Sequence, residues 1–177
     1  ALGPQKKRHD LYKIDRQTLH EPLEKKLELL NEIDAIARAY DPRIKQVLAN
    51  ISSEVRHVVI ARADGQITVD KRPLARLNVT CVAQDGSNKQ TGSAGGGGRF
   101  GFEFFFDGDR YQQYVNEAAR RAILLLSAID SPAGTMDVVL GPGWPGILPH
   151  EAIGHGLEGD FNRKGSSAFS GLVGKQV

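Results

Sequence analysis

The sequence lacks several features that would place it in a specialised class of protein. Its 177 residues include one cysteine, Cys81, so no disulfide can form within the chain, and a reducing compartment is expected. No apolar run is long enough to cross a membrane, and no apolar segment follows the polar start, so neither a span nor a signal peptide is expected. The net charge of +2 argues against a broad basic surface for nucleic acid. We therefore expect a cytoplasmic protein without direct membrane or nucleic-acid contacts.

A first amphipathic helix is predicted over residues 21–40. Thr18 and Glu21 have the spacing of a capping box just before it. Asp41-Pro42 should end it, because the residue before a proline is disfavoured in the helical region. Apolar side chains recur every three or four residues, which is the pattern of a helix with one buried face. The predicted buried stripe is Leu23, Leu27, Leu30, Ile33, Ala37 and Tyr40.

Strands are predicted next, because short segments rich in Val, Ile and Thr are separated by turn residues. Asp64-Gly65 reads as a tight hairpin and Asp85-Gly86 as another turn. A last strand over 88–93 leads into the glycine run at 95–98. We expect an antiparallel meander of four or five strands, half covered by helices. The earlier strands are predicted at 44–51, 55–63, 66–72 and 75–84.

A second long helix is predicted from Gly108 or Asp109 to about Ile129, before the breaker sequence at 131–134. Residues 136–140 read as a short buried strand, and a last helix begins near Leu148 or Pro149. The predicted buried face of the second long helix consists of Tyr111, Tyr114, Val115, Ala118, Ala122, Leu125, Leu126 and Ile129.

The predicted fold class is α+β, with an antiparallel sheet packed against two long helices and a short C-terminal helix. The expected domains are a polar arm or linker over 1–17, an α+β domain over 18–130, and the start of a metal-binding region over 131–177.

The chemically informative motif is H-E-x-x-x-H, formed by His150, Glu151 and His155. Neutral imidazoles are good zinc ligands, and a carboxylate beside the first can take a proton from water. On a regular helix, residues five apart lie about 140° apart, which suits one ion poorly. A π-type turn of roughly 4.4 residues reduces this to about 50°. Either such a turn or a helix end at Gly154 is therefore expected, so the motif predicts an irregularity at residues 153–155. Two unrelated histidines are the alternative.

Two histidines do not complete a catalytic zinc site, which normally has three protein ligands. Glu158 and Asp160 are candidates by type, either as ligands or as hydrogen-bond partners that orient the histidines, and the second role is favoured. Cys81 is chemically suited to zinc, but its place within a strand favours a buried structural thiol.

The glycine run is a second candidate site. Gly96, Gly98 and Gly101 match a dinucleotide-binding spacing, but the phenylalanine-rich segment that follows is no helix start, so a nucleotide loop is not expected. The run is then either a flexible loop or a backbone that a peptide substrate can approach closely. Arg99 could meet a substrate carboxylate or carbonyl.

Four blocks of sequence together resemble the TldD branch of the TldD/PmbA metallopeptidase family. They are GGGGRFG at 95–101, PAGTM at 132–136, GWPG at 143–146 and HEAIGHGLEGDFNR at 150–163. The resemblance runs from about residue 19 to the end. It implies a cytoplasmic zinc peptidase, also known as a candidate DNA gyrase modulator and linked to peptide maturation. It further implies pairing with a PmbA/TldE-type subunit or a homodimer.

The resemblance also implies residue roles. His150 and His155 are then zinc ligands, Glu151 is the general base, and Gly95, Gly96, Gly97, Gly98 and Arg99 bind the peptide substrate. The family's third ligand is a cysteine in a C-terminal region outside this chain, and Cys81 does not match it. The chain is therefore expected to be an internal fragment that alone binds zinc weakly and is inactive. The alternatives are a non-catalytic module that binds a partner in gyrase modulation, and a metal hydrolase that cuts a different bond, such as an amidase.

Overall fold

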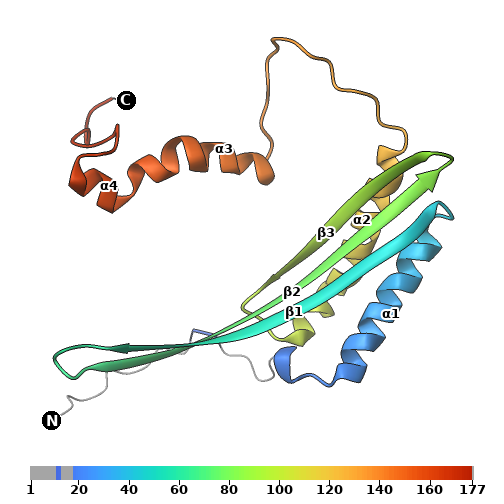
Figure 1. The fold of residues 1–177 in the computed structure, drawn as a ribbon, viewed down its shortest axis with the longest axis horizontal. Coiled ribbons are helices and arrows are strands. Elements are labelled where there is room, and N and C mark those ends of the chain that lie inside the picture. The colour runs from blue at the N-terminus through green and yellow to red at the C-terminus, as the bar shows by residue number, and fades with distance from the viewer. Residues whose placement is uncertain (1–10, 13–17, 177) are drawn as a thin grey trace. The chain divides into compact units, whose positions relative to one another are not determined.

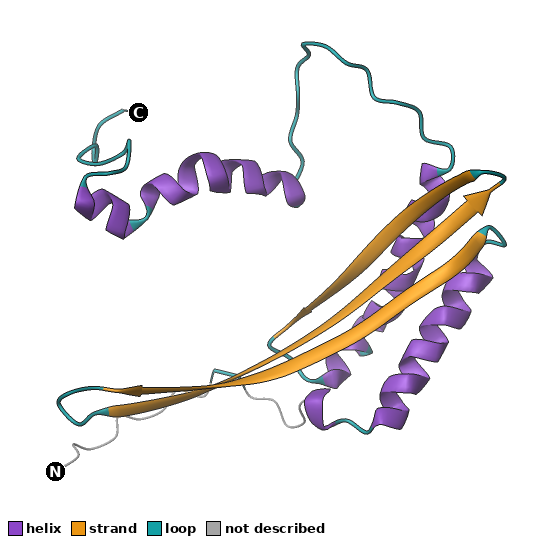
Figure 2. Cartoon of the chain, viewed as in Figure 1, coloured by secondary structure: helices purple, strands orange, loops and turns teal. Residues whose placement is uncertain are grey.

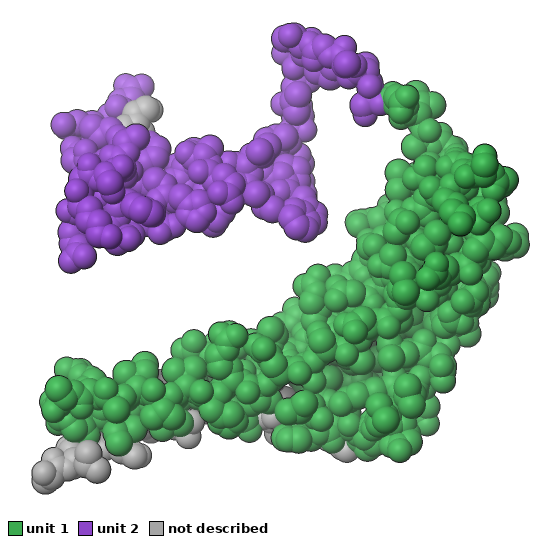
Figure 3. All heavy atoms as spheres, in the orientation of Figure 1, with its two compact units in different colours: residues 1–130 green, residues 131–177 purple. Residues whose placement is uncertain are grey.

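The computed structural model describes residues 11, 12 and 18–176 in two compact units, Ala1–Asp130 and Ser131–Val177 (Figure 3). Most of the predicted arm at 1–17 lies outside the described residues. The first unit contains, in chain order, η1 (Thr18–His20), α1 (Leu23–Tyr40), β1 (Ile44–Ala61), β2 (Ile67–Asp85), β3 (Asn88–Gly98), η2 (Phe102–Phe105), η3 (Asp107–Asp109) and α2 (Arg110–Leu125). The second contains η4 (Trp144–Gly146), α3 (Ile147–Pro149), η5 (His150–Gly154), η6 (His155–Leu157) and α4 (Gly159–Lys164).

An antiparallel sheet in the order β1-β2-β3 forms one layer of the first unit, and α1 and α2 form the other (Figures 1 and 2). This confirms the α+β class. The prediction of four or five strands was wrong, because β1 and β2 each replace two predicted strands. Their ladder is unbroken from the pair Leu48/Thr80 to the pair Ala61/Ile67. The polar residues 52–54 interrupt the apolar pattern but not the backbone pairing, which needs no apolar side chain.

Both predicted turns are present. Gly65 follows the end of β1 with φ 82°, and Gly86 joins β2 to β3 with φ 57°. Positive φ favours glycine, so the Asp-Gly pairs located the turns correctly.

Helix α1 ends as predicted, with Asp41 extended at φ −157° and ψ 137°. The capping box was wrong: the helix begins at Leu23, Pro22 precedes it, and no side-chain cap is formed. The buried stripe is Leu29, Ile33 and Ala37, whereas the predicted Leu23, Leu27 and Tyr40 are exposed. Leu27 lies about 120° around the helix from Ile33 at 100° per residue, so both cannot face the sheet.

Helix α2 begins within two residues of its predicted start but ends at Leu125 rather than near Ile129. The backbone then makes turn-type hydrogen bonds to residues three earlier, as Leu126, Ser127 and Ala128 donate to Ile123, Leu124 and Leu125. Ile129 is 92% exposed. Residues 136–140 form no strand and their side chains are exposed, so the predicted short buried strand was also wrong.

The core lies between the sheet and the two helices. Alternate residues of β2 face it, and α2 contributes a face with three alanines. The fully enclosed side chains include Phe105, Leu29, Ile33, Leu77, Val79, Val115 and Cys81.

The glycine run is part of a strand, not a flexible loop. Positions 92, 94 and 96 of β3 are opposite the core-facing Cys81, Val79 and Leu77 of β2. They carry Gly, Ala and Gly, which lets α2 approach the strand. A Cβ atom added at Gly92 would lie 2.2 Å from the Ala118 carbonyl oxygen, and one at Gly96 would lie 2.4 Å from the Tyr114 hydroxyl. Close packing therefore explains these glycines.

Candidate metal centre

The H-E-x-x-x-H motif lies on a helix whose winding changes at the motif. A 3-10 turn at Trp144–Gly146 leads into a short α-helical turn, which includes Pro149. Residues His150–Gly154 then form a π-helical turn, and His155–Leu157 form a 3-10 turn. The helix starts slightly before the predicted Leu148 or Pro149, but the predicted irregularity is confirmed. Of the two forms left open by the spacing, the π turn is present.

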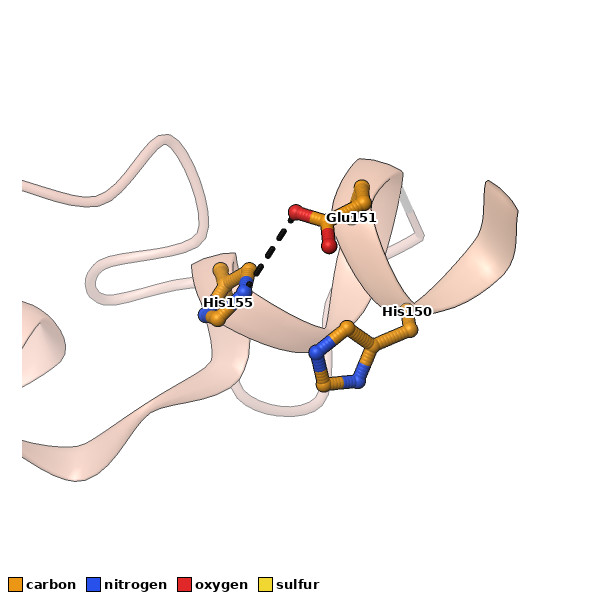
Figure 4. A group of neighbouring side chains, drawn as sticks. All are labelled: His150, Glu151 and His155. Carbon is orange, nitrogen blue, oxygen red and sulfur yellow. Dashed lines mark ion pairs between the residues drawn. The ribbon is translucent and has the colours of Figure 1, made fainter. Parts of the chain in front are cut away.

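The π turn brings the three motif side chains together (Figure 4). One ligand atom from each of His150, Glu151 and His155 lies within 4.8 Å of the others. The two imidazole rings have centroids 4.7 Å apart and planes at 70°. Glu151 Oε2 lies 3.4 Å from His155 Nε2. All three side chains are exposed in the second unit, so water can reach the group.

This donor set fits a zinc ion by its chemistry. Zinc takes imidazole nitrogens at 2.0–2.1 Å, so two nitrogens on one tetrahedral ion lie about 3.4 Å apart. The observed limit of 4.8 Å is wider than this. Exposed side chains can close the difference by small rotations about χ1 and χ2.

Glu158 is a direct neighbour of the motif, as its Oε1 lies 2.5 Å from His155 Nδ1. This hydrogen bond, followed by the negative charge of Glu151, raises the pKa of His155. Asp160, the other predicted carboxylate, forms an ion pair with Lys164 at 3.8 Å. Glu158 therefore contacts His155, whereas Asp160 pairs with a lysine.

Gly95, Gly96, Gly97, Gly98 and Arg99 belong to the first unit. The glycines end β3, which is an edge strand of the sheet in the described part of the chain. Arg99 donates from Nη1 to the Pro73 carbonyl oxygen at 3.3 Å, and its guanidinium lies 5.0 Å from the centre of the Tyr12 ring. Arg99 therefore already has contacts within its own unit.

Cys81 is fully buried in β2, and burial raises the pKa of its thiol to about 11. Zinc is bound by the thiolate, which such a thiol forms only at high pH. The expected structural thiol is confirmed.

No role was predicted for Asn162 from the sequence. Its Nδ2 donates to the carbonyl oxygens of Gly156 and Glu158, at 2.8 and 2.9 Å. The sequence feature that could have indicated this role is an asparagine four residues after Glu158, because side-chain amides commonly form hydrogen bonds with nearby backbone groups.

Comparison with known proteins gives matches to metallopeptidases. The family model of the PmbA/TldA metallopeptidase central domain matches residues 18–126. The Metalloprotease TldD homolog of Haemophilus influenzae is 51% identical over 158 residues, which are 87% of this chain and 33% of that protein. The Zinc metalloprotease TldD homolog of Saccharolobus solfataricus is 26% identical over 159 residues, covering 90% of this chain and 35% of that protein.

A solved structure shows the same fold. The crystal structure of a candidate modulator of a DNA gyrase from Thermotoga maritima superimposes with a TM-score of 0.61. The likeness covers 75% of this chain and 29% of that chain at 20% identity, which supports the fold alone. The chain spans about a third of the length of the curated relatives it matches. Among the described residues, no helix is long and apolar enough to cross a membrane.

Proposed function

Because this chain belongs to the PmbA/TldA metallopeptidase family, we propose that it carries the metal-binding and proton-transferring residues of a zinc-dependent peptidase of the TldD type. The observation that supports this most is the convergence of His150, Glu151 and His155 on a π turn, although the histidines are five residues apart. A relative named zinc metalloprotease supports zinc as the metal.

In this proposal, His150 and His155 hold the metal through imidazole nitrogens. A bound zinc would polarise the peptide carbonyl and make water more acidic. Glu151 takes a proton from water and gives it to the leaving amine. Its Oε2 lies 3.4 Å from His155 Nε2, so the carboxylate is next to a nitrogen that would hold the metal. A cysteine outside this chain supplies the third ligand, as the family resemblance implies. The chain alone should therefore bind zinc weakly and be inactive.

The edge of β3 is proposed to receive the peptide. An unpaired strand edge can bond an extended peptide through its backbone, whatever the peptide's sequence. The glycines at 95–98 have no side chains that would obstruct this pairing, and Arg99 follows them. We further propose a cytoplasmic enzyme that works with a PmbA/TldE-type subunit or as a homodimer, in line with its free, buried Cys81.

The test is zinc affinity and peptide hydrolysis by the full-length protein that contains this chain. His150→Ala and His155→Ala should each lose zinc and activity. Glu151→Gln should keep zinc and lose activity by about 10²–10⁴-fold, the usual contribution of a general base. His57→Ala is the matched control, because His57 lies on β1 and outside the motif. Full activity of Glu151→Gln would refute the assigned roles.

The second candidate is a non-catalytic module that binds a partner; it is considered because the Thermotoga maritima protein is described as a candidate modulator of a DNA gyrase. It predicts that partner binding is unchanged in His150→Ala and after chelation. The peptidase predicts that hydrolysis is lost under both conditions, so the two functions separate in one set of variants.

A further inference from the structure

The two ring nitrogens of His155 have different neighbours. Nδ1 lies 2.5 Å from Glu158 Oε1, and Nε2 lies 3.4 Å from Glu151 Oε2 on the side of the motif. An ionised carboxylate only accepts hydrogen bonds, so the short contact places the proton of a neutral ring on Nδ1. The Nε2 lone pair is then left for a metal ion.

Several contacts fix the turn that carries Glu158. Asn162 Nδ2 donates to the Glu158 carbonyl oxygen at 2.9 Å and to the Gly156 carbonyl oxygen at 2.8 Å. Ser167 Oγ donates to the same Gly156 oxygen at 2.5 Å. The Phe169 ring leaves no space for a side chain at position 156, since a Cβ there would lie 2.5 Å from it. The backbone between His155 and Glu158 is therefore held by residues that follow it.

We propose that Glu158 is a positioning residue of the metal centre, which holds His155 as the Nδ1–H tautomer with Nε2 toward the metal, and that Asn162 keeps Glu158 in place. This inference rests on the proposed function. Hydrogen-bond partners of this kind typically change metal affinity or activity by about 10–100-fold when removed.

A plain surface ion pair is the competing explanation. The side chains of His155 and Glu158 are 50% and 46% exposed, so as an isolated pair they would contribute little to stability. The two explanations differ in what the pair controls. If the contact is a plain surface ion pair, its removal changes neither the tautomer of His155 nor the zinc affinity. If Glu158 positions His155, its removal changes both.

The experiment compares full-length protein with Glu158→Ala, Glu158→Gln, Asn162→Ala and the matched control Asp160→Asn, whose carboxylate pairs with Lys164 instead. The first measurement is the tautomer of His155 in metal-free protein, read from its imidazole ¹⁵N shifts at a pH where the ring is neutral. The second is zinc affinity by competition with a chromogenic chelator.

Wild type and Asp160→Asn should show the Nδ1–H tautomer and equal zinc affinity. Glu158→Ala should lose that tautomer and bind zinc about 10–100-fold more weakly. Glu158→Gln should keep the tautomer and lose less affinity, because its amide oxygen still accepts from Nδ1. Asn162→Ala should lose affinity in the same direction as Glu158→Ala.

Two results would overturn the positioning role: an Nε2–H tautomer in wild type, or unchanged zinc affinity in Glu158→Ala. If His155→Ala loses zinc while Glu158→Ala keeps it, the inference fails and the proposed function stands. If wild type shows the Nδ1–H tautomer but binds no zinc, the proposed function fails and the positioning role fails with it, while the tautomer assignment stands.

Discussion

Replacing Gly92 with alanine tests the close approach between α2 and β3. The new Cβ would lie 2.2 Å from the Ala118 carbonyl oxygen and 2.3 Å from the Ala122 backbone nitrogen. Both atoms belong to the backbone of α2, so no side-chain rotation can relieve the contact. The strand and helix must instead separate by about 1 Å, which disturbs a close-packed core.

Overpacking a core typically costs about 1–3 kcal/mol, and a contact with helix backbone belongs at the upper end. We expect Gly92→Ala to lower the unfolding free energy by about 3 kcal/mol. Its melting temperature should fall by about 10 °C, at roughly 4 °C per kcal/mol for a unit of this size. Thermal unfolding followed by far-ultraviolet circular dichroism measures the change.

Gly96→Ala is the matched comparison on the same strand and face. Its Cβ would meet the hydroxyl end of the Tyr114 side chain at 2.4 Å, and that side chain can move. We expect a loss below about 1 kcal/mol, because a favourable alanine effect on the unfolded chain offsets part of the contact. Equal stability of Gly92→Ala and wild type would refute the close approach of α2 to β3.

Two further predictions concern the core thiol and the motif spacing. Burial raises the pKa of Cys81 to about 11, so native protein at pH 8 should resist thiol reagents until it unfolds. Because the folded state favours the neutral thiol, its contribution to stability should be complete below pH 9 and lost as pH rises toward about 11, which urea titrations at several pH values measure. Deleting Ile153 leaves the histidines four apart, about 40° around a regular helix and close to the roughly 50° of the π turn, so zinc affinity should stay within about tenfold. Inserting an alanine after Ile153 leaves them about 120° apart and should abolish binding; retained zinc binding by that variant would contradict the geometric argument.

The sequence predicted local features well where one residue type decides the geometry. Both Asp-Gly turns and the helix stop at Asp41-Pro42 were found, because glycine and proline restrict the backbone directly. The irregularity at residues 153–155 followed from the motif spacing, which left open a π-type turn or a helix end at Gly154; the structure has the π turn. Such constraints need no knowledge of the partner elements.

Features that depend on packing between elements were predicted less well. The polar residues 52–54 were read as a break, yet β1 continues through them because its backbone pairs with β2. The glycine run at 95–98 was read either as a flexible loop or as a backbone that a peptide approaches. The structure rules out the flexible loop, because these residues lie in β3 and Tyr114 of α2 packs on Gly96. No local pattern shows that a helix later in the chain will need this space.

Which of the two carboxylates, Glu158 or Asp160, contacts His155 depends on where one helix ends and the next begins. At spacings of three and five residues from His155, either carboxylate could be its partner on a continuous helix with a suitable turn. The structure ends the motif helix at Leu157 and gives Glu158 an extended backbone, with ψ 136°. That break turns Glu158 toward His155 and places Asp160 in the first turn of α4, four residues before Lys164. The extended Glu158 therefore contacts His155, whereas Asp160 pairs with a lysine of its own helix.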